Sequence, residues 1–165
     1  MSVQPAVFLD RDGVINRERD AHTWRLEEFE VLPGVPEAVK VLRNAGYEVV
    51  VITNQSGIGL GLYDHAAVEE THRYLHDMLA AHGAHLTAIY YCPHHPTGGR
   101  CLCRKPGGLM LERAIARFGI DASRSVMIGD RQRDVDAAAS VGVRGLLVEA
   151  NAPLLPVVMN EVLHA

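Results

Sequence analysis

The sequence has no excess of basic residues, few cysteines and no long apolar run. Its 16 lysines and arginines are outnumbered by 20 aspartates and glutamates, which gives a net charge of −4. Because a nucleic-acid partner requires a basic face, we expect no such partner. No apolar stretch has the length of a membrane span, and none precedes Asp10 as the core of a secretion signal. We therefore expect a cytoplasmic protein with no membrane partner.

The cysteine count and the overall composition limit the class of protein further. Three cysteines are an odd number, which argues against a disulfide framework. The chain has 165 residues, of which 48% are hydrophobic and 22% are charged, as in ordinary globular proteins that bury a core without disulfides. We expect a single domain over residues 1–165, present as a monomer.

Apolar, β-rich stretches alternate with amphipathic stretches along the chain. The expected strands are 6–9, 47–52, 86–91, 125–128 and 143–148. The expected helices are 37–44, 65–82, 109–118, 134–140 and 155–163. This alternation predicts a doubly wound α/β fold around a five-stranded, mainly parallel sheet. Residues 17–30 follow neither pattern, so we expect a loop or flap there.

An acidic pair, Asp10 and Asp12, directly follows the first expected strand. Two carboxylates this close repel each other unless a cation or a proton offsets the repulsion, and taken alone the pair also fits a solvated turn. In a parallel sheet the carboxyl ends of the strands share one edge, where ligands bind, so Thr53 and Asp130 should meet the pair. Lys105 can reach the same edge. Carboxylate oxygens suit Mg²⁺, and a hydroxyl and a lysine suit an anion.

Four short motifs stand in order at these positions: Asp10-Arg11-Asp12-Gly13-Val14, Thr53, Lys105 and Gly129-Asp130-x-x-x-Asp134. In order and spacing they resemble the motifs of the haloacid dehalogenase-like (HAD) phosphatases. The sequence has no insertion large enough for a cap domain, so it resembles the capless branch of that family.

This resemblance implies a role for each motif residue. Asp10 is the implied nucleophile, which forms an aspartyl-phosphate, and Asp12 is the implied general acid and base. The implied Mg²⁺ ligands are Asp10, the Asp12 carbonyl and Asp130, while Thr53 and Lys105 bind the phosphoryl oxygens. For Asp134 two interpretations stay open: it orients the waters of the metal, or it is an acid at a helix N-terminus.

A second group of residues uses all three cysteines. The C-x-H and C-x-C pairs supply four ligands across a short loop, as in a closed tetrahedral zinc site; the ligands are Cys92, His94, Cys101 and Cys103. His95 is an alternative to His94, and three unrelated reduced thiols are the alternative to a metal site. A structural zinc ion would fix the loop that carries Arg104 and Lys105 to the phosphate edge.

Three sequence segments narrow the resemblance: Cys-Pro-His-His-Pro, Cys-x-Cys-Arg-Lys-Pro and Thr-Asn-Gln-Ser-Gly-Ile. They are similar to the branch that contains the heptose-1,7-bisphosphate 7-phosphatases of lipopolysaccharide precursor synthesis and the histidinol-phosphate phosphatases. The resemblance implies a small phosphorylated sugar as substrate, contacted by Arg11, Asn54, Gln55, Ser56 and Arg104. Residues 17–22 depart from the heptose pattern, so a histidinol-phosphate phosphatase or another small sugar-phosphate phosphatase stays open. A non-catalytic, zinc-stabilised interaction domain is the alternative from another class.

Weaker signals receive structural interpretations. The glycines of residues 57–61 lack the spacing of a nucleotide-binding loop and indicate a flexible loop near the pocket. His72 and His76 lie four residues apart with no glutamate of the H-E-x-x-H kind between them, so we expect them on a solvated helix face. Trp24 lies either over the pocket or in a surface loop.

Overall fold

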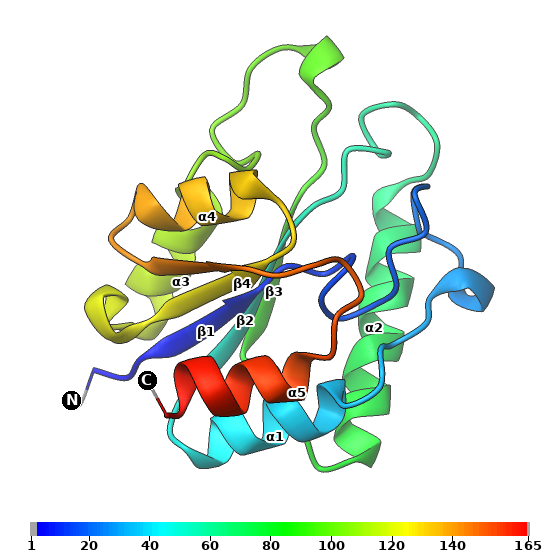
Figure 1. Cartoon of the computed structure of the whole chain (residues 1–165). Helices are drawn as coiled ribbons and strands as arrows, with labels where there is room; N and C mark the ends of the chain where they lie inside the picture. Colours follow the sequence, from blue (N-terminus) through cyan, green and yellow to red (C-terminus); the bar gives the residue numbers. More distant parts are fainter. Residues whose placement is uncertain (1–2, 165) are drawn as a thin grey trace.

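The computed structural model describes residues 3–164, in which a parallel five-stranded sheet lies between two layers of helices (Figure 1). The strands run in the spatial order β3-β2-β1-β4-β5. Their bounds are β1 (Ala6–Leu9), β2 (Glu48–Asn54), β3 (Ala88–Cys92), β4 (Val126–Gly129) and β5 (Arg144–Leu147). The predicted doubly wound α/β fold is confirmed.

The helices follow the expected alternation, with small differences at their ends. Their bounds are α1 (Val35–Asn44), α2 (His65–Ala81), α3 (Leu109–Phe118), α4 (Gln132–Ala139) and α5 (Leu154–Val157). A π-helical turn, Val158–Val162, continues α5. Helix α4 begins two residues earlier than predicted, because the Asp134 side chain accepts from the backbone N–H of Arg131 and the Arg131 carbonyl accepts from the N–H of Asp134. Residues 17–30 form the expected loop, with one 3₁₀ turn at Leu26–Glu28.

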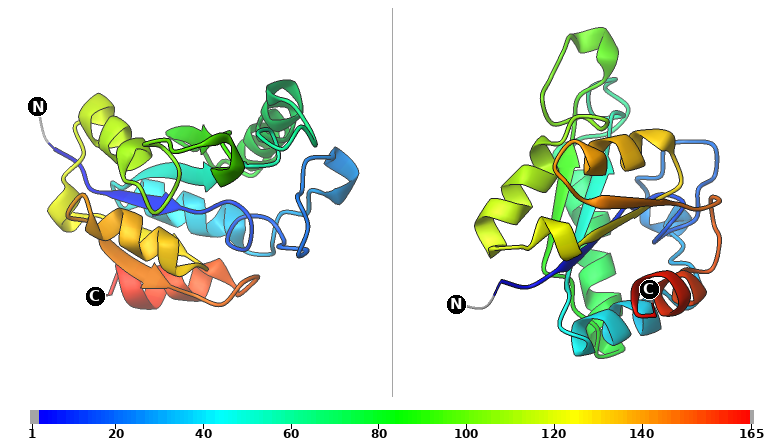
Figure 2. Two further views of the ribbon diagram at one scale, coloured as in Figure 1. Left: turned by 90° about the horizontal axis from the view of Figure 1, so that it is seen from above. Right: turned by 60° about the vertical axis from the view of Figure 1, so that its left-hand side comes forward.

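The sheet buries both of its faces, and β1 lies at its centre. Val7 and Leu9 pack into one apolar cluster, while Ala6 and Phe8 pack into the other, as the alternation of side chains along a strand requires. The first cluster includes Leu42 of α1, Leu75 of α2 and Leu154 of α5, and the second includes Met110 of α3 and Ala137 of α4. Figure 2 shows the resulting three layers from above. A strand buried on both faces explains why the predicted strands read as continuous apolar runs.

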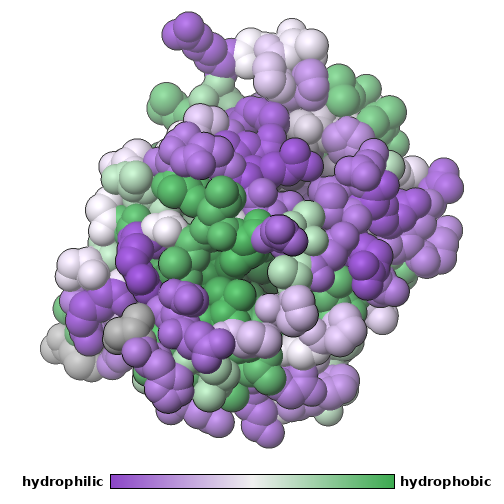
Figure 3. All heavy atoms as spheres, viewed as in Figure 1, coloured by the Kyte–Doolittle hydropathy of each residue, from purple (hydrophilic) through white to green (hydrophobic). Residues whose placement is uncertain are grey.

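The face of the molecule seen in Figure 3 is largely polar. Figure 3 also shows an apolar area in the middle of this face, where the edge strand β5 lies in Figure 1, and Leu147 of β5 is 57% exposed. Within residues 3–164, no helix combines the length and the apolar character that crossing a membrane demands.

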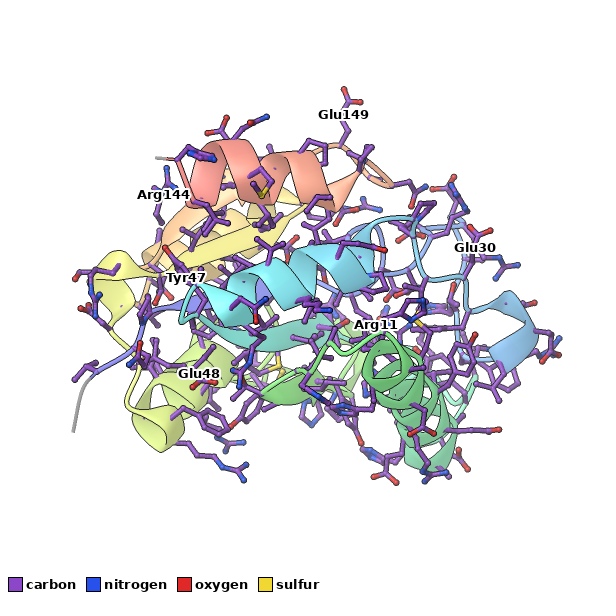
Figure 4. The ribbon with its side chains drawn as sticks, turned by 90° about the horizontal axis from the view of Figure 1, so that it is seen from below. Arg11, Glu30, Tyr47, Glu48, Arg144 and Glu149 are labelled. Carbon is purple, nitrogen blue, oxygen red and sulfur yellow. The ribbon has the colours of Figure 1, made fainter. Side chains whose placement is uncertain are left out.

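The strand register brings three polar strand ends together. Leu9, the last residue of β1, pairs with Val51 of β2 on one side and with Ile128 of β4 on the other. Asp10 comes next and donates its backbone N–H to the carbonyl of Ile128 at 3.0 Å. Figure 4 shows Arg11 and Glu30 on the side of the molecule away from Tyr47 and Glu48, and Glu48 is the first residue of β2. The carboxyl edge of the sheet is therefore the place where a site can form.

Candidate active site

A cavity of about 370 Å³ opens at the carboxyl edge of the sheet. Its lining includes six residues that the sequence singles out: Asp10, Asp12, Asn54, Gln55, Ser56 and Asp130. Thr53 and Lys105 are each 1% exposed and lie beneath this lining. The flap contributes Glu18, Asp20 and His22, and the start of α4 contributes Arg131 and Arg133.

Lys105 is a buried cation at the centre of the site. Its Nζ donates to Asp10 Oδ1 at 2.9 Å and to the carbonyl of Ile52 at 2.7 Å, and it lies 2.6 Å from Asp134 Oδ1. Burial alone lowers the pKa of Lys105, but the carboxylates of Asp10 and Asp134 outweigh burial, so its pKa is raised. Lys105 therefore carries its positive charge at neutral pH and offsets the charge of the acidic cluster.

The Asp12 carboxylate is held by three donors. Arg11 Nη2 and Asn16 Nδ2 each donate to Oδ1 at 2.9 Å, and Gln55 Nε2 donates to Oδ2 at 3.1 Å. Burial raises the pKa of Asp12, but the charge of Arg11 and these hydrogen bonds outweigh it and lower the pKa overall. Asp12 is thus ionised, in a fixed orientation, beside Asp10.

Asp130 is buried without a hydrogen-bond partner for either carboxylate oxygen. Burial, followed by the proximity of Asp10, raises the pKa of Asp130 to about 7. Carboxylate oxygens of Asp10, Asp130 and Asp134 lie within 4.8 Å of one another, so these three side chains could hold a metal ion. Unpartnered, crowded carboxylate oxygens are the donor set that a hard divalent cation such as Mg²⁺ prefers.

Gly13 makes room for this carboxylate cluster. Its φ is +92°, in the left-handed region, and a Cβ atom at this position would lie 2.4 Å from Asp130 Oδ2. Only glycine adopts this backbone conformation readily and also leaves Asp130 in place.

Asp134 combines a role in the site with one in its helix. It accepts a hydrogen bond from the backbone N–H of Arg131 at 3.0 Å, as an acid in the first turn of a helix does. Its other oxygen, Oδ1, contacts Lys105. The helix-terminal interpretation therefore holds, and Asp134 also belongs to the acidic cluster of the site.

Arg11, predicted to contact the substrate, does not line the cavity. Its side chain has no exposed surface, is absent from the cavity lining, and lies beside α2 (Figure 4). Besides Asp12, the guanidinium contacts the carbonyl of Thr23 at 2.8 Å and the ring of Phe29, 5.3 Å from its centroid. Arg11 thus acts on the site through Asp12.

The prediction of a solvated helix face is wrong for His72 and right for His76. His76 is exposed, whereas His72 is 7% exposed and its Nε2 lies 3.4 Å from Arg11 Nη1. Burial, followed by the charge of Arg11, lowers the pKa of His72 to about 3. His72 is therefore neutral at physiological pH and accepts the hydrogen bond from Arg11.

Arg104 also lies outside the cavity that holds the carboxylates. It lines a second cavity, of about 820 Å³, together with Cys101, Pro106 and Leu109, and its Nη1 donates to the carbonyl of His94 at 3.4 Å. The cations that line the first cavity are Arg131 and Arg133, which the sequence analysis missed. Their position directly after Gly129-Asp130, at the start of a helix, is the signal that identifies them.

Trp24 packs beside the first cavity and does not line it. Its ring stacks on that of Tyr63, with 5.8 Å between centroids and 16° between planes. Both residues line a third cavity, together with Leu62 and His65. The loop of residues 57–61 is a series of turns that leads from β2 to Tyr63.

The predicted zinc ligands come together in the loop after β3. One ligand atom from each of Cys92, His94, Cys101 and Cys103 lies within 4.8 Å of the others, so this group could hold a metal ion. Cys92 Sγ lies 3.4 Å from His94 Nδ1, 3.7 Å from Cys101 Sγ and 3.0 Å from Cys103 Sγ. His95 is outside the group, since its Nδ1 accepts from the backbone N–H of Thr97.

Comparisons with known proteins agree with this geometry. Residues 102–152 match the HAD-hydrolase-like family model. The chain is 40% identical over 164 residues to D-glycero-β-D-manno-heptose-1,7-bisphosphate 7-phosphatase of Escherichia coli K12, covering 94% of this chain and 85% of that protein. It is 41% identical over 143 residues to the phosphatase of the same name from Pseudomonas aeruginosa, covering 87% of this chain and 80% of that protein.

Solved structures give the same result. The D,D-heptose 1,7-bisphosphate phosphatase of B. bronchiseptica, complexed with magnesium and phosphate, superposes with a TM-score of 0.84 at 36% identity. That match covers 96% of this chain and 88% of the other. A HAD-like phosphatase of Mesorhizobium loti superposes with a TM-score of 0.82 at 32% identity, over 88% of this chain and 72% of the other.

Proposed function

This chain belongs to the HAD-like phosphatase family that includes the heptose-1,7-bisphosphate 7-phosphatases, and we propose that it removes the 7-phosphate of D-glycero-D-manno-heptose 1,7-bisphosphate. The observation that carries the proposal is the Asp10–Lys105–Asp134 cluster beside Asp12 at the carboxyl edge of the sheet. In this proposal the cluster supplies a nucleophile, a proton carrier and a cation around one small volume.

Asp10 is the proposed nucleophile. Lys105 Nζ and the backbone N–H of Arg11 both donate to Oδ1, so Oδ2 is the oxygen left for attack on phosphorus. The attack forms an aspartyl-phosphate and releases the sugar alcohol. Mg²⁺ held by Asp10, the Asp12 carbonyl and Asp130 would reduce the repulsion between the carboxylate and the phosphate. The unpartnered oxygens of buried Asp130 support this assignment.

Asp12 is the proposed general acid and base. Because Asp12 is ionised in the free protein, it must first take up a proton, and the negative charge of the bound substrate phosphate beside it favours this uptake. Asp12 then gives this proton to the leaving sugar oxygen and takes one from the water that hydrolyses the aspartyl-phosphate, a role typically worth about 10²–10⁴ in rate. The Thr53 hydroxyl and the Lys105 ammonium are proposed to stabilise the charge on the transferring phosphoryl group.

The rim of the cavity supports a substrate with a second phosphate. Arg131 and Arg133 line the cavity, and so do Glu18 and Asp20. The two arginines suit a second phosphate group, and the acids suit sugar hydroxyls as hydrogen-bond acceptors. We assign this role to Arg131 and Arg133 ahead of Arg104 because Arg104 lines a different cavity.

A phosphoester panel tests the proposal. It contains both anomers of heptose 1,7-bisphosphate, histidinol phosphate and simple sugar phosphates, each with and without Mg²⁺. We expect Mg²⁺-dependent release of one phosphate from the heptose bisphosphate, with the highest kcat/KM of the panel. A higher kcat/KM for histidinol phosphate would transfer the assignment to that related activity.

The nucleophile has its own test. Asp10→Asn keeps the size of the side chain but removes the attacking charge, so turnover should fall below a few per cent of wild type. Mass spectrometry of acid-quenched wild-type enzyme should detect the phosphorylated residue at Asp10. An Asp10→Asn variant that turns over at a higher level would refute the assignment.

We further propose that the Cys/His group binds a structural zinc ion. Zn–S bonds of about 2.3 Å place two sulfur ligands about 3.8 Å apart in a tetrahedral site, and Cys92 and Cys101 are 3.7 Å apart. Four protein ligands leave no open position for catalysis. The zinc ion would instead hold the loop between Cys92 and Cys103, which leads directly to Lys105.

A further inference from the structure

The two amide residues at the end of β2, Asn54 and Gln55, use their side chains inside the protein. Asn54 Oδ1 accepts from the backbone N–H of Lys105 at 3.0 Å, and Asn54 Nδ2 donates to the Lys105 carbonyl at 3.2 Å. The side chain therefore brackets the backbone of Lys105 from both sides, as a neighbouring strand would. Lys105 follows the metal-binding loop and belongs to no strand, so this pair ties it to the sheet.

Gln55 is more fully engaged. It is 3% exposed, and its Nε2 donates to Asp12 Oδ2 at 3.1 Å and to Thr53 Oγ1 at 3.0 Å. Its Oε1 accepts from the Tyr63 hydroxyl at 2.9 Å. Both hydrogens of the amide nitrogen are in use, and the Asp12 carboxylate, which can only accept, fixes which end of the amide faces the acids. Rotating the amide by 180° would place Oε1 against the Asp12 carboxylate, and the two oxygens would repel each other.

The Gln55 contact also sets the direction of the Thr53 hydroxyl. Because Oγ1 accepts from Gln55, the hydroxyl hydrogen must point to another acceptor, which in the structure is the Asn54 carbonyl at a long 3.4 Å. An anionic phosphoryl oxygen is a stronger acceptor than this distant carbonyl. Gln55 thus prepares Thr53 as a donor toward phosphate.

The same contact leaves one oxygen of Asp12 less engaged than the other. Oδ1 accepts from Arg11 and Asn16, while Oδ2 accepts from Gln55. Oδ2 therefore has the greater remaining capacity for a proton. Gln55 holds this oxygen in place.

Tyr63 in turn is held by the surrounding loop. A Cβ atom on Gly57 would lie 2.0 Å from the Tyr63 ring, so Gly57 has to lack a side chain for the ring to reach Gln55. The Tyr63 ring also stacks on the ring of Trp24 in the flap, residues 17–30.

We infer that Asn54 and Gln55 are positioning residues, Asn54 for Lys105 and Gln55 for Asp12 and Thr53, and that they are not sugar-recognition residues. This inference rests on the proposed phosphatase mechanism but not on the identity of the sugar. It assigns the substrate specificity to the remaining cavity lining, which includes Ser56, Arg131 and Arg133.

The test compares two substrates, heptose 1,7-bisphosphate and p-nitrophenyl phosphate, which has no sugar. Asn54→Leu and Gln55→Met keep the side-chain length and remove the amide groups. We expect kcat on the heptose bisphosphate to fall about 10- to 100-fold, with KM within about twofold of wild type. The rate on p-nitrophenyl phosphate should fall as well, by a smaller factor for Gln55→Met, because p-nitrophenolate leaves without a proton from Asp12. Asn44→Leu, which removes an exposed amide at the end of α1, is the matched control and should leave both activities unchanged.

A positioning role and a sugar-binding role for Asn54 and Gln55 predict different outcomes. If either variant loses activity on the sugar bisphosphate through a higher KM and keeps its rate on p-nitrophenyl phosphate, that residue contacts the sugar and the inference is overturned. Asn54→Asp keeps the Oδ1 acceptor and the size of the side chain, so it should fold and show a loss of kcat smaller than that of Asn54→Leu. Equal kcat for Asn54→Asp and wild type would contradict the role of the Nδ2 contact.

Failure of the inference is distinguishable from failure of the proposed function. If the wild-type protein hydrolyses p-nitrophenyl phosphate and no heptose bisphosphate, the sugar assignment fails. The kcat comparison of the variants on p-nitrophenyl phosphate then still decides the role of the two amides.

Discussion

The buried His72 makes the folded protein sensitive to acid. The pKa of His72 is lowered from 6.5 to about 3, first by burial and then by the charge of Arg11 3.4 Å away. A group whose pKa is lower in the folded state binds its proton more readily in the unfolded chain. Its contribution to stability is therefore fully present above pH 6.5 and is lost as the pH falls below that value.

The size of the effect follows from the distance in pH. A pH of 5 lies about 1.5 units below the pKa that His72 has in the unfolded chain, and each unit is worth about 1.36 kcal/mol. His72 therefore lowers the free energy of unfolding at pH 5 by about 2 kcal/mol. Because His72 is 7% exposed, solvent screening reduces this figure little. Asp130, whose pKa is raised to about 7, has the opposite slope, but that contribution is common to wild type and the variants below.

Urea unfolding at several pH values between 8 and 5 measures the effect. His72→Gln retains an acceptor for the Arg11 hydrogen bond but does not titrate. We expect the free energy of unfolding of wild type, relative to His72→Gln, to decrease by about 2 kcal/mol from pH 8 to pH 5. Ala80→Ser, at an exposed position of the same helix and without a titratable group, is the control and should show a constant difference from wild type. A constant difference for His72→Gln as well would refute the reasoning.

Two further predictions concern the metal sites. Gly13→Ala should weaken activation by Mg²⁺ about 10- to 100-fold in a titration of activity, because its Cβ would lie 2.4 Å from Asp130 Oδ2. Gly61→Ala has a similar positive φ of +74° and no atom within 4 Å of its Cβ, so it should lose stability but retain normal Mg²⁺ activation; equal activation curves for both variants would contradict the steric argument. Elemental analysis of the purified protein should find about one zinc per chain, and less in Cys103→Ser. A zinc-free wild-type protein would refute the zinc assignment.

The fold follows largely from local pattern. The apolar runs predict the strands, and their continuity predicts burial on both faces, because a parallel sheet between helices has no solvated face. Strand β2 nevertheless extends to Asn54, beyond the predicted end at residue 52, since Thr53 and Asn54 pair with Tyr91 and Cys92 of β3. In the sequence, the polar residues Thr53 and Asn54 are typical of a loop. Only their pairing with β3 makes them part of a strand.

The sequence by itself determined which polar groups gather at the site, because the carboxyl ends of parallel strands share one edge. It placed Asp10, Asp12 and Asp130 at that edge and grouped the three cysteines with His94. The tertiary structure decided the direction of each side chain. Arg11 turns under the site toward α2, Asn54 turns to Lys105, and His72 turns inward to Arg11. Such directions depend on contacts between residues about 50 to 60 positions apart, which neither periodicity nor motif spacing encodes.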